Sequence, residues 1–118
     1  MDEFSWFVGL YEGEGCFTFN TKPGRKEGKE NRYGFLCLQI KMTDEDTIER
    51  ASKFLGVKYN TIDRSKEKPH YKTIYRVRKQ GGLNGELMDL ITRMKPYLCK
   101  RRQEQIEVAI QKCKNLSK

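Results

Sequence analysis

Apolar and polar residues follow two spacings along this chain, one typical of helices and the other of strands. The helical spacing predicts four helices and strict alternation predicts four strands. In chain order these are a helix at 3–14, strands at 16–22 and 33–42, a helix from Thr43 to Gly56, strands at 57–64 and 71–78, and helices at 83–94 and 100–115. The order is that of one α+β domain over residues 1–118, with helices covering one face of a four-stranded antiparallel sheet.

The residues at the ends of these elements support their boundaries. Thr43 precedes an acidic run and is predicted to cap the second helix, with Asp46 in the reciprocating position. Gly56 is predicted to end that helix, and Pro96 to end the third. Polar turns are expected at 23–31 and 65–70.

Alternation within the strands places a second set of side chains on the sheet face opposite the helices. On the second strand, Leu36, Leu38 and Ile40 share the apolar face. The opposite face is predicted to carry Thr18, Asn20, Lys22, Phe35, Cys37, Gln39, Lys41, Lys72, Arg76 and Arg78. Gln and Arg side chains read base edges in the major groove of DNA, but an ordinary solvated sheet face also carries polar residues.

Composition narrows the classes of protein to consider. The 118 residues are 34% charged and 36% hydrophobic, which indicates a globular chain. No apolar run approaches the ~20 residues of a membrane span, and the acidic start is the reverse of a secretory signal, so no membrane partner is expected. We expect an intracellular, reducing location, in a bacterial or phage cytoplasm or an organelle. Four cysteines would then be reduced thiols: Cys16, Cys37, Cys99 and Cys113.

The net charge of +8 favours a polyanionic partner, and its distribution strengthens that interpretation. Basic residues are concentrated in two segments, and the segment between them is acidic around Asp44. The basic segments contribute Lys22, Arg25, Lys26, Lys29 and Arg32, and then Arg64, Lys66, Lys68, Lys72, Arg76, Arg78 and Lys79. Together with the polar strand face, this predicts binding to double-stranded DNA, with the two turns on flanking phosphates.

The first helix carries the residues that point to chemistry. Gly9 and Gly13 lie on one helical face, where another backbone can approach closely. Glu12 and Glu14 are separated by ~200° around a helix, so they point in different directions. Glu14 falls at the negative end of the helix dipole, where a divalent cation held by carboxylate and carbonyl oxygens would compensate the charge.

Residues 7–15, Phe-Val-Gly-Leu-Tyr-Glu-Gly-Glu-Gly, resemble the LAGLIDADG motif of single-motif homing endonucleases. Glu12 and Glu14 stand where the motif has aspartates. A second stretch, Met94-Lys95-Pro96-Tyr97-Leu98 with Lys100 and Gln103, resembles the segment after the third helix in that family. The predicted order of elements is similar to the family's fold over essentially the whole chain.

The resemblance implies a homodimer in which the motif helices of two subunits pack along the two-fold axis and the sheets form a saddle over DNA. The interface residues would be Trp6, Phe7, Gly9, Leu10 and Gly13. The apolar character of this helix on almost all sides is expected when one side faces the sheet and another faces a partner. The alternative is a buried helix in a monomer.

The resemblance also implies Mg²⁺-dependent hydrolysis of both strands of a long, pseudo-palindromic DNA site, leaving short 3′ overhangs. Glu14 and the Gly13 carbonyl would hold the metal, for which Mn²⁺ could substitute, and Glu12 would be structural. Lys100, or Arg101 in its place, would stabilise charge on the phosphate. Relatives can orient water with a polar residue at the end of the second strand, where this chain has Lys41 and Met42.

Two other functions remain open at the level of sequence. The scaffold could belong to a nucleic-acid binder that does not cut, such as an intron maturase with its host intron RNA as partner, or a DNA-binding repressor. It could also be a basic interaction domain without nucleic acid. We expect no small-molecule substrate and give His70, on a charged turn, no catalytic role.

Overall fold

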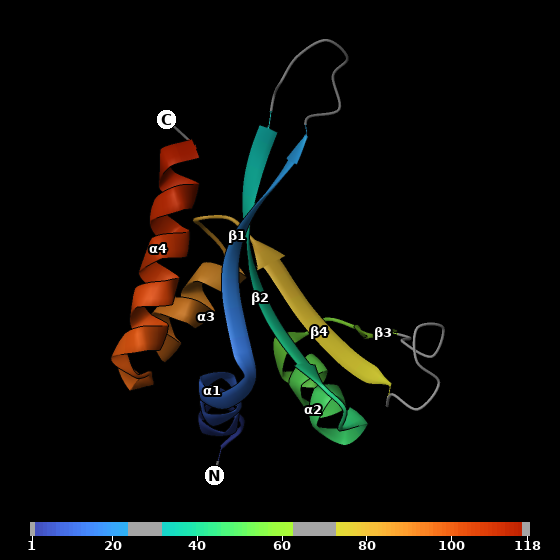
Figure 1. Ribbon diagram of the computed structural model, residues 1–118. Coiled ribbons are helices and arrows are strands. Elements are labelled where there is room, and N and C mark those ends of the chain that lie inside the picture. Colours follow the sequence, from blue (N-terminus) through green and yellow to red (C-terminus); the bar gives the residue numbers. More distant parts are fainter. Residues whose placement is uncertain (1, 24–31, 63–72, 117–118) are drawn as a thin grey trace. The chain divides into compact units, whose positions relative to one another are not determined.

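The structure, a computed structural model, describes residues 2–23, 32–62 and 73–116 (Figure 1). The predicted order of helices and strands is confirmed, with one additional 3-10 turn. The elements are α1 (Glu3–Glu14), β1 (Gly15–Pro23), β2 (Arg32–Met42), α2 (Glu45–Leu55), β3 (Tyr59–Ile62), β4 (Ile74–Gly81), α3 (Glu86–Met94), the turn η1 (Lys95–Tyr97) and α4 (Lys100–Leu116).

The four strands form one sheet in the order β1-β2-β4-β3. By its contacts the chain divides into two units, Met1–Cys16 with Gln39–Lys79, and Phe17–Leu38 with Gln80–Lys118. The first unit therefore contains α1, α2, β3 and most of β4, and the second contains α3, η1, α4 and most of β1. The prediction of one domain over the whole chain stays a prediction.

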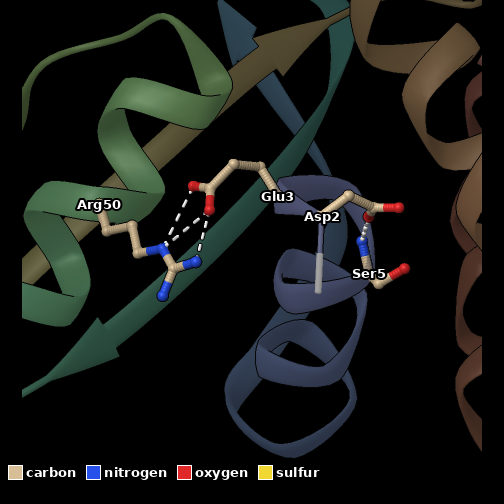
Figure 2. Close-up of polar contacts among 4 residues, drawn as sticks. All are labelled: Asp2, Glu3, Ser5 and Arg50. Carbon is tan, nitrogen blue, oxygen red and sulfur yellow. Dashed lines mark hydrogen bonds and ion pairs between the residues drawn. The ribbon is translucent and has the colours of Figure 1, made fainter.

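In the first unit, α1 packs against α2 through aromatic and charged side chains. The Phe7 ring stacks on Phe54, with centroids 4.7 Å apart and planes at 23°. Near the start of α1, the Arg50 guanidinium forms an ion pair with Glu3 (Figure 2). The same guanidinium lies 4.0 Å above the centre of the Trp6 ring. Aromatic stacking and a cation over an indole face both favour one fixed orientation of the two helices.

The start of α2 differs from the prediction by one residue. Asp44, with extended backbone angles, is the N-cap in place of Thr43, and its carboxylate accepts a 2.7 Å hydrogen bond from the Thr47 hydroxyl. Thr43 was predicted as the cap because a Thr with an acid three residues later is a common start signal, but Asp is also a preferred cap. Gly56 ends the helix in the left-handed conformation (φ 71°), as predicted.

Alternate residues of β3 and β4 face α2. The Tyr59 hydroxyl donates to the Glu45 carboxylate at 2.9 Å, and Lys79 Nζ donates to the Leu55 carbonyl at 2.8 Å. The bond to Glu45 stabilises the neutral phenol and raises the pKa of Tyr59. Val77, which pairs with Tyr59 across the strands, is fully buried. The odd-numbered residues of this hairpin thus point to the helix, and the even-numbered ones point away.

Strand and helix boundaries near turns differ from the predictions by a few residues. β3 is shorter than the predicted 57–64, and β4 begins at Ile74 and not at 71. The third helix was predicted from residue 83 but begins at Glu86, because Gly85 at its N-cap has φ 114° and interrupts the helical backbone. The predicted apolar face of β2 is confirmed, since Leu36, Leu38 and Ile40 are fully buried.

In the second unit, the turn η1 is tied to α4 by side chains. The Gln103 amide donates to the carbonyl oxygens of Lys95 (2.9 Å) and Leu98 (3.2 Å). Lys95 also forms a 2.7 Å ion pair with Glu107 on the next turn of α4. These contacts satisfy carbonyls at the end of α3 and fix the chain that leads to Lys100.

None of the helices in the described part of the chain is both long enough and apolar enough to span a bilayer.

Candidate nucleic-acid interface and metal site

The two faces of α1 differ in side-chain size. One face carries Phe7, Val8 and Tyr11, which are buried, and Phe7 stacks on Phe54 of the first unit. The opposite face carries a line of small, exposed residues at four-residue spacing, Ser5, Gly9 and Gly13. Apart from the neighbouring backbone of the helix itself, a methyl group added at Gly9 or Gly13 would meet no atom of the described residues within 4 Å. The exposed glycine face is therefore open to a close neighbour.

The predicted interface residues divide between these faces. Gly9 and Gly13 are exposed, and Trp6 and Leu10 are half-buried. Phe7 is 0% exposed and stacks on Phe54, so its prediction as a dimer contact is wrong. The sequence indicated that the helix is apolar on almost all sides. It did not indicate that Phe7 is the apolar residue that packs against α2.

The N-terminus of α1 is held by its own carboxylates. Asp2 accepts a 2.6 Å hydrogen bond from the Ser5 N–H and caps the helix, while Glu3 reaches the Arg50 guanidinium (Figure 2). Arg50 Nε lies 3.2 Å from both Glu3 oxygens. Each of these hydrogen bonds stabilises an ionised carboxylate and so lowers its pKa. Arg50 lowers the pKa of Glu3, and the Ser5 N–H lowers the pKa of Asp2.

The C-terminus of α1 exposes the carboxylate predicted to bind metal. Glu14 is the last residue of the helix and is exposed, as is Gly13, whereas Glu12 is half-buried. The next residue, Gly15, has extended angles (φ −82°), so it does not end the helix by a left-handed turn. Instead, a methyl group at Gly15 would lie 2.2 Å from the Tyr11 ring, so the helix can lead directly into β1 only at a residue without a side chain.

Glu14 is a single exposed carboxylate, a type of donor that suits a hard divalent cation. Among residues 2–23, 32–62 and 73–116, no cluster of three or more His, Cys, Asp or Glu side chains is placed to hold a metal. Mg²⁺ is often bound by one or two carboxylates, with phosphate and water oxygens completing an octahedron. An exposed carboxylate at a helix C-terminus, where carbonyl oxygens accumulate, fits that kind of site.

Basic residues gather in the first turn of α4. Lys100 and Arg101 are exposed, while Arg102 is buried and donates to the Gln105 side chain at 3.2 Å. Cations at the positive end of a helix dipole are unfavourable unless an anion is near, which suits a phosphate-binding position. Lys100 belongs to the second unit and Glu14 to the first.

The polar side chains predicted on β1 and β2 are mostly exposed. Thr18 and Asn20 are exposed and share a 3.0 Å hydrogen bond. Lys41 is exposed, and Phe35, Gln39 and Met42 are half-buried. The prediction that Cys37 contacts DNA is wrong, because this thiol is 5% exposed and lies 3.9 Å from the Leu38 carbonyl. Its small side chain on an inner strand of the sheet is covered where longer side chains reach solvent.

On β4, Arg76 is half-buried and Arg78 is exposed, both on the side away from α2. Asn60 of β3 lies directly across from Arg76 and was not predicted as a site residue. This pairing could not be found from sequence, because the spacing of the two strands gives no register across the eleven residues, 63–73, that connect them.

The structure describes only some of the remaining residues that were predicted to contact DNA. Lys22 and Arg32 lie in β1 and β2 by their backbones. Outside the described residues are Arg25, Lys26, Lys29, Arg64, Lys66, Lys68 and Lys72, together with His70.

Comparison with solved structures identifies the fold. No protein-family model matches this sequence, and no curated protein is similar enough to match it. The homing endonuclease I-CvuI, crystallised with the I-CreI target, superposes with a TM-score of 0.66 at 18% identity, over 98% of this chain and 68% of that one.

Two further homing endonucleases agree with this comparison. I-TnaI has a TM-score of 0.60 at 15% identity, over 91% of this chain and 67% of that one. I-GzeII, a LAGLIDADG homing endonuclease in complex with its DNA target, has a TM-score of 0.61 at 14% identity, over 99% of this chain and 36% of that one. This chain spans about a third of the length of I-GzeII. The resemblance seen in residues 7–15 is confirmed at the level of structure: the chain has the fold of the LAGLIDADG homing endonucleases.

Proposed function

We propose that this chain is a homodimeric, site-specific DNA endonuclease that hydrolyses both strands of a long, pseudo-palindromic duplex with Mg²⁺. The observation that carries the proposal is the position of Glu14. It is an exposed carboxylate at the end of α1, immediately after an exposed glycine face that is open to a second helix. A nucleic-acid binder that does not cut could use the same glycine face to dimerise, but it would not need the carboxylate of Glu14.

The dimer places two copies of the same acid close together. If Gly9 and Gly13 of two α1 helices cross, each helix ends beside its partner, and the two Glu14 carboxylates lie near the two-fold axis. A two-fold axis of this kind repeats every contact on both halves of the DNA, which is why the site is expected to be pseudo-palindromic.

The residues of this chain then have separate tasks at each scissile phosphate. Glu14, with the Gly13 carbonyl, would hold the metal, and Mn²⁺ is an alternative ion. When the metal is bound, the chemistry available is polarisation of the phosphate and acidification of an attacking water. Lys100, or Arg101 beside it, would stabilise the charge that develops on the phosphate, and cutting would leave short 3′ overhangs.

Recognition would use the strand surfaces. Thr18, Asn20, Gln39, Lys41, Arg76 and Arg78 would face base edges, and the basic turns would contact flanking phosphates without specifying sequence. We propose further that the chain acts inside the cell and is encoded by an intron. The RNA of that host intron would then be a further partner.

A selection for cleaved sequences tests the activity. The purified chain is incubated with a randomised duplex library and Mg²⁺, and cut molecules are sequenced; a long, two-fold symmetric consensus is the expected result. Glu14→Gln keeps the size of the side chain and removes its charge, so cutting should fall by about 100-fold or more while binding persists. Glu104→Gln, an exposed substitution of the same kind on α4, should leave cutting unchanged.

Other outcomes point to the other functions. Binding of duplex without any cut by the unmodified chain would favour a non-cutting role, as a repressor or as a maturase if intron RNA binds more tightly than DNA. No binding to duplex at ~50 mM salt, where phosphate contacts are strongest, would favour a basic interaction domain and overturn the proposal.

A further inference from the structure

The even-numbered residues of the β3–β4 hairpin form a surface that faces away from α2. Their odd-numbered neighbours bind that helix, because Tyr59 donates to Glu45 and Lys79 donates to the Leu55 carbonyl. On the opposite surface, Asn60 pairs with Arg76 and Ile62 pairs with Ile74 in the strand register. Asn60 is exposed and Arg76 is half-buried, so their polar groups lie at the edge of solvent.

The side chain of Asn60 holds the guanidinium of Arg76. Arg76 Nε donates to the Asn60 side-chain oxygen at 3.3 Å. With the amide turned so that both of its ends are satisfied, the oxygen accepts from Arg76 Nη2 at 3.0 Å and the nitrogen donates to the Arg76 carbonyl at 3.0 Å. In either orientation, the Nε–Nη2 edge of the guanidinium faces Asn60.

A guanidinium is planar, so fixing one edge fixes the direction of the others. With the Nε–Nη2 edge on Asn60, the terminal edge formed by Nη1 and the second proton of Nη2 points away from Asn60. Two parallel N–H donors on one edge match the O6 and N7 acceptors of guanine in the major groove. Ile74 lies two residues before Arg76 on the same surface of β4, and both residues are half-buried.

Arg78 provides a comparison on the same strand and the same surface. It is two residues farther along β4 and exposed, beyond the end of the β3 pairing at Tyr59 and Val77. The distance between the two positions is about 6.6 Å along a strand. This corresponds to about two base-pair steps of ~3.4 Å, so the two arginines would reach different base pairs.

We infer that Asn60 is a positioning residue that orients Arg76 to read a guanine in each half of the DNA site. This inference rests on the proposed function and adds to it a base identity and the residue pair that sets it. Arg76 makes the contact, and Asn60 acts through Arg76 by holding the guanidinium before DNA arrives, which reduces the side-chain freedom lost on binding.

The test is the sequence preference of each variant, measured by selection of bound or cleaved duplexes. Arg76→Lys keeps the charge and removes the two-donor edge, so preference for guanine at one position per half-site should fall about 5- to 100-fold while overall binding changes little. Asn60→Ala should lower the same preference about two- to tenfold, as expected for one lost hydrogen bond. The preference set by Arg78, about two base pairs away, should be unchanged.

Matched variants separate this role from a general loss of structure. Thr61→Ala, on the neighbouring residue of β3 and the opposite side of the strand, should leave every position unchanged. Arg78→Lys should weaken a different position, and adding Asn60→Ala to it should not weaken that position further. Restoring an oxygen acceptor with Asn60→Asp should recover part of the guanine preference.

The failures are distinguishable. If the unmodified chain neither binds nor cuts duplex DNA, the proposed function fails and this inference fails with it. If it binds or cuts a defined site but Arg76→Lys changes no base preference, or Asn60→Ala weakens all positions equally, the proposed function stands and the guanine-reading pair is overturned.

Discussion

The two faces of α1 are built from opposite kinds of residue on the same twelve-residue helix. One face has large aromatic and aliphatic side chains, Phe7, Val8 and Tyr11, that are buried within the chain. The other has two glycines that this chain leaves uncovered. The first face therefore explains how the helix is held, and the second is the face on which we propose that a second subunit packs. Substitutions on each face should accordingly affect different measurements.

The largest effect is expected on the buried face. Phe7→Ala removes a fully buried ring and its stack on Phe54, which should lower the free energy of unfolding by about 3–5 kcal/mol. Urea denaturation followed by circular dichroism measures it. Leu10→Ala, at a half-buried position, should cost clearly less. If Phe7→Ala instead leaves stability unchanged and dissociates a dimer, the division between the faces is wrong.

On the glycine face, stability and assembly should change in opposite directions. Gly9→Leu places a large side chain where α1 would meet its partner, and should raise the dimer dissociation constant about 30-fold or more, equivalent to about 2 kcal/mol. Because no described residue opposes a methyl group there, the monomer should gain up to about 0.8 kcal/mol from helix propensity. Analytical ultracentrifugation measures assembly.

The control for this prediction is Lys112→Leu, which adds an exposed leucine to α4 and should not change assembly. A monomeric wild-type chain, or a Gly9→Leu variant that dimerises as tightly as the wild type, would show that the glycine face has another purpose.

A smaller effect is expected where the helix leads into β1. Gly15→Ala puts a methyl group against the Tyr11 ring and should destabilise the fold by about 1–3 kcal/mol, since the ring must move. Its φ of −82° suits any residue, so the whole cost is steric. Gly13→Ala, two residues earlier and unobstructed, is the matched control and should not destabilise. Equal effects of the two substitutions would contradict this difference.

The fold could be predicted from sequence further than the site could. Spacing alone gave the order of elements, because α1, β2 and α4 each bury one consistent set of residues, such as Leu36, Leu38 and Ile40 on β2. The predicted ends of helices and strands near turns were less accurate. Asp44 and not Thr43 caps α2, and α3 begins only after Gly85, whose backbone is not helical.

Side-chain partners distant in sequence were not predictable. Arg50 lies 47 residues from Glu3, and the Asn60–Arg76 pair depends on strand register. The family resemblance misassigned Phe7 and strand alternation misassigned Cys37, because neither tells which residue is covered by its own chain. The role of Gln103 is similar: the sequence marked it as part of a motif, and only the structure shows it bound to the carbonyls before α4.

The smallest predicted effect concerns the N-terminal end of α1. Arg50 holds the pKa of Glu3 below its ordinary value of 4.5, chiefly through its hydrogen bonds. A carboxyl whose pKa is lowered by folding stabilises the folded state above its unfolded pKa, and this stabilisation is lost as the pH falls through the folded pKa.

Glu3→Gln removes that group. The variant should therefore melt slightly below the wild type at pH 7, and the difference should shrink as the pH is lowered from about 4.5. Melting curves of both proteins between pH 7 and pH 3 measure it, and Glu104→Gln is the control for a change of surface charge alone. Both groups of the ion pair are exposed and screened by solvent, so the difference should be modest and should decrease with added salt. A difference that stays constant across this range would show that Glu3 acts through packing and not through its charge.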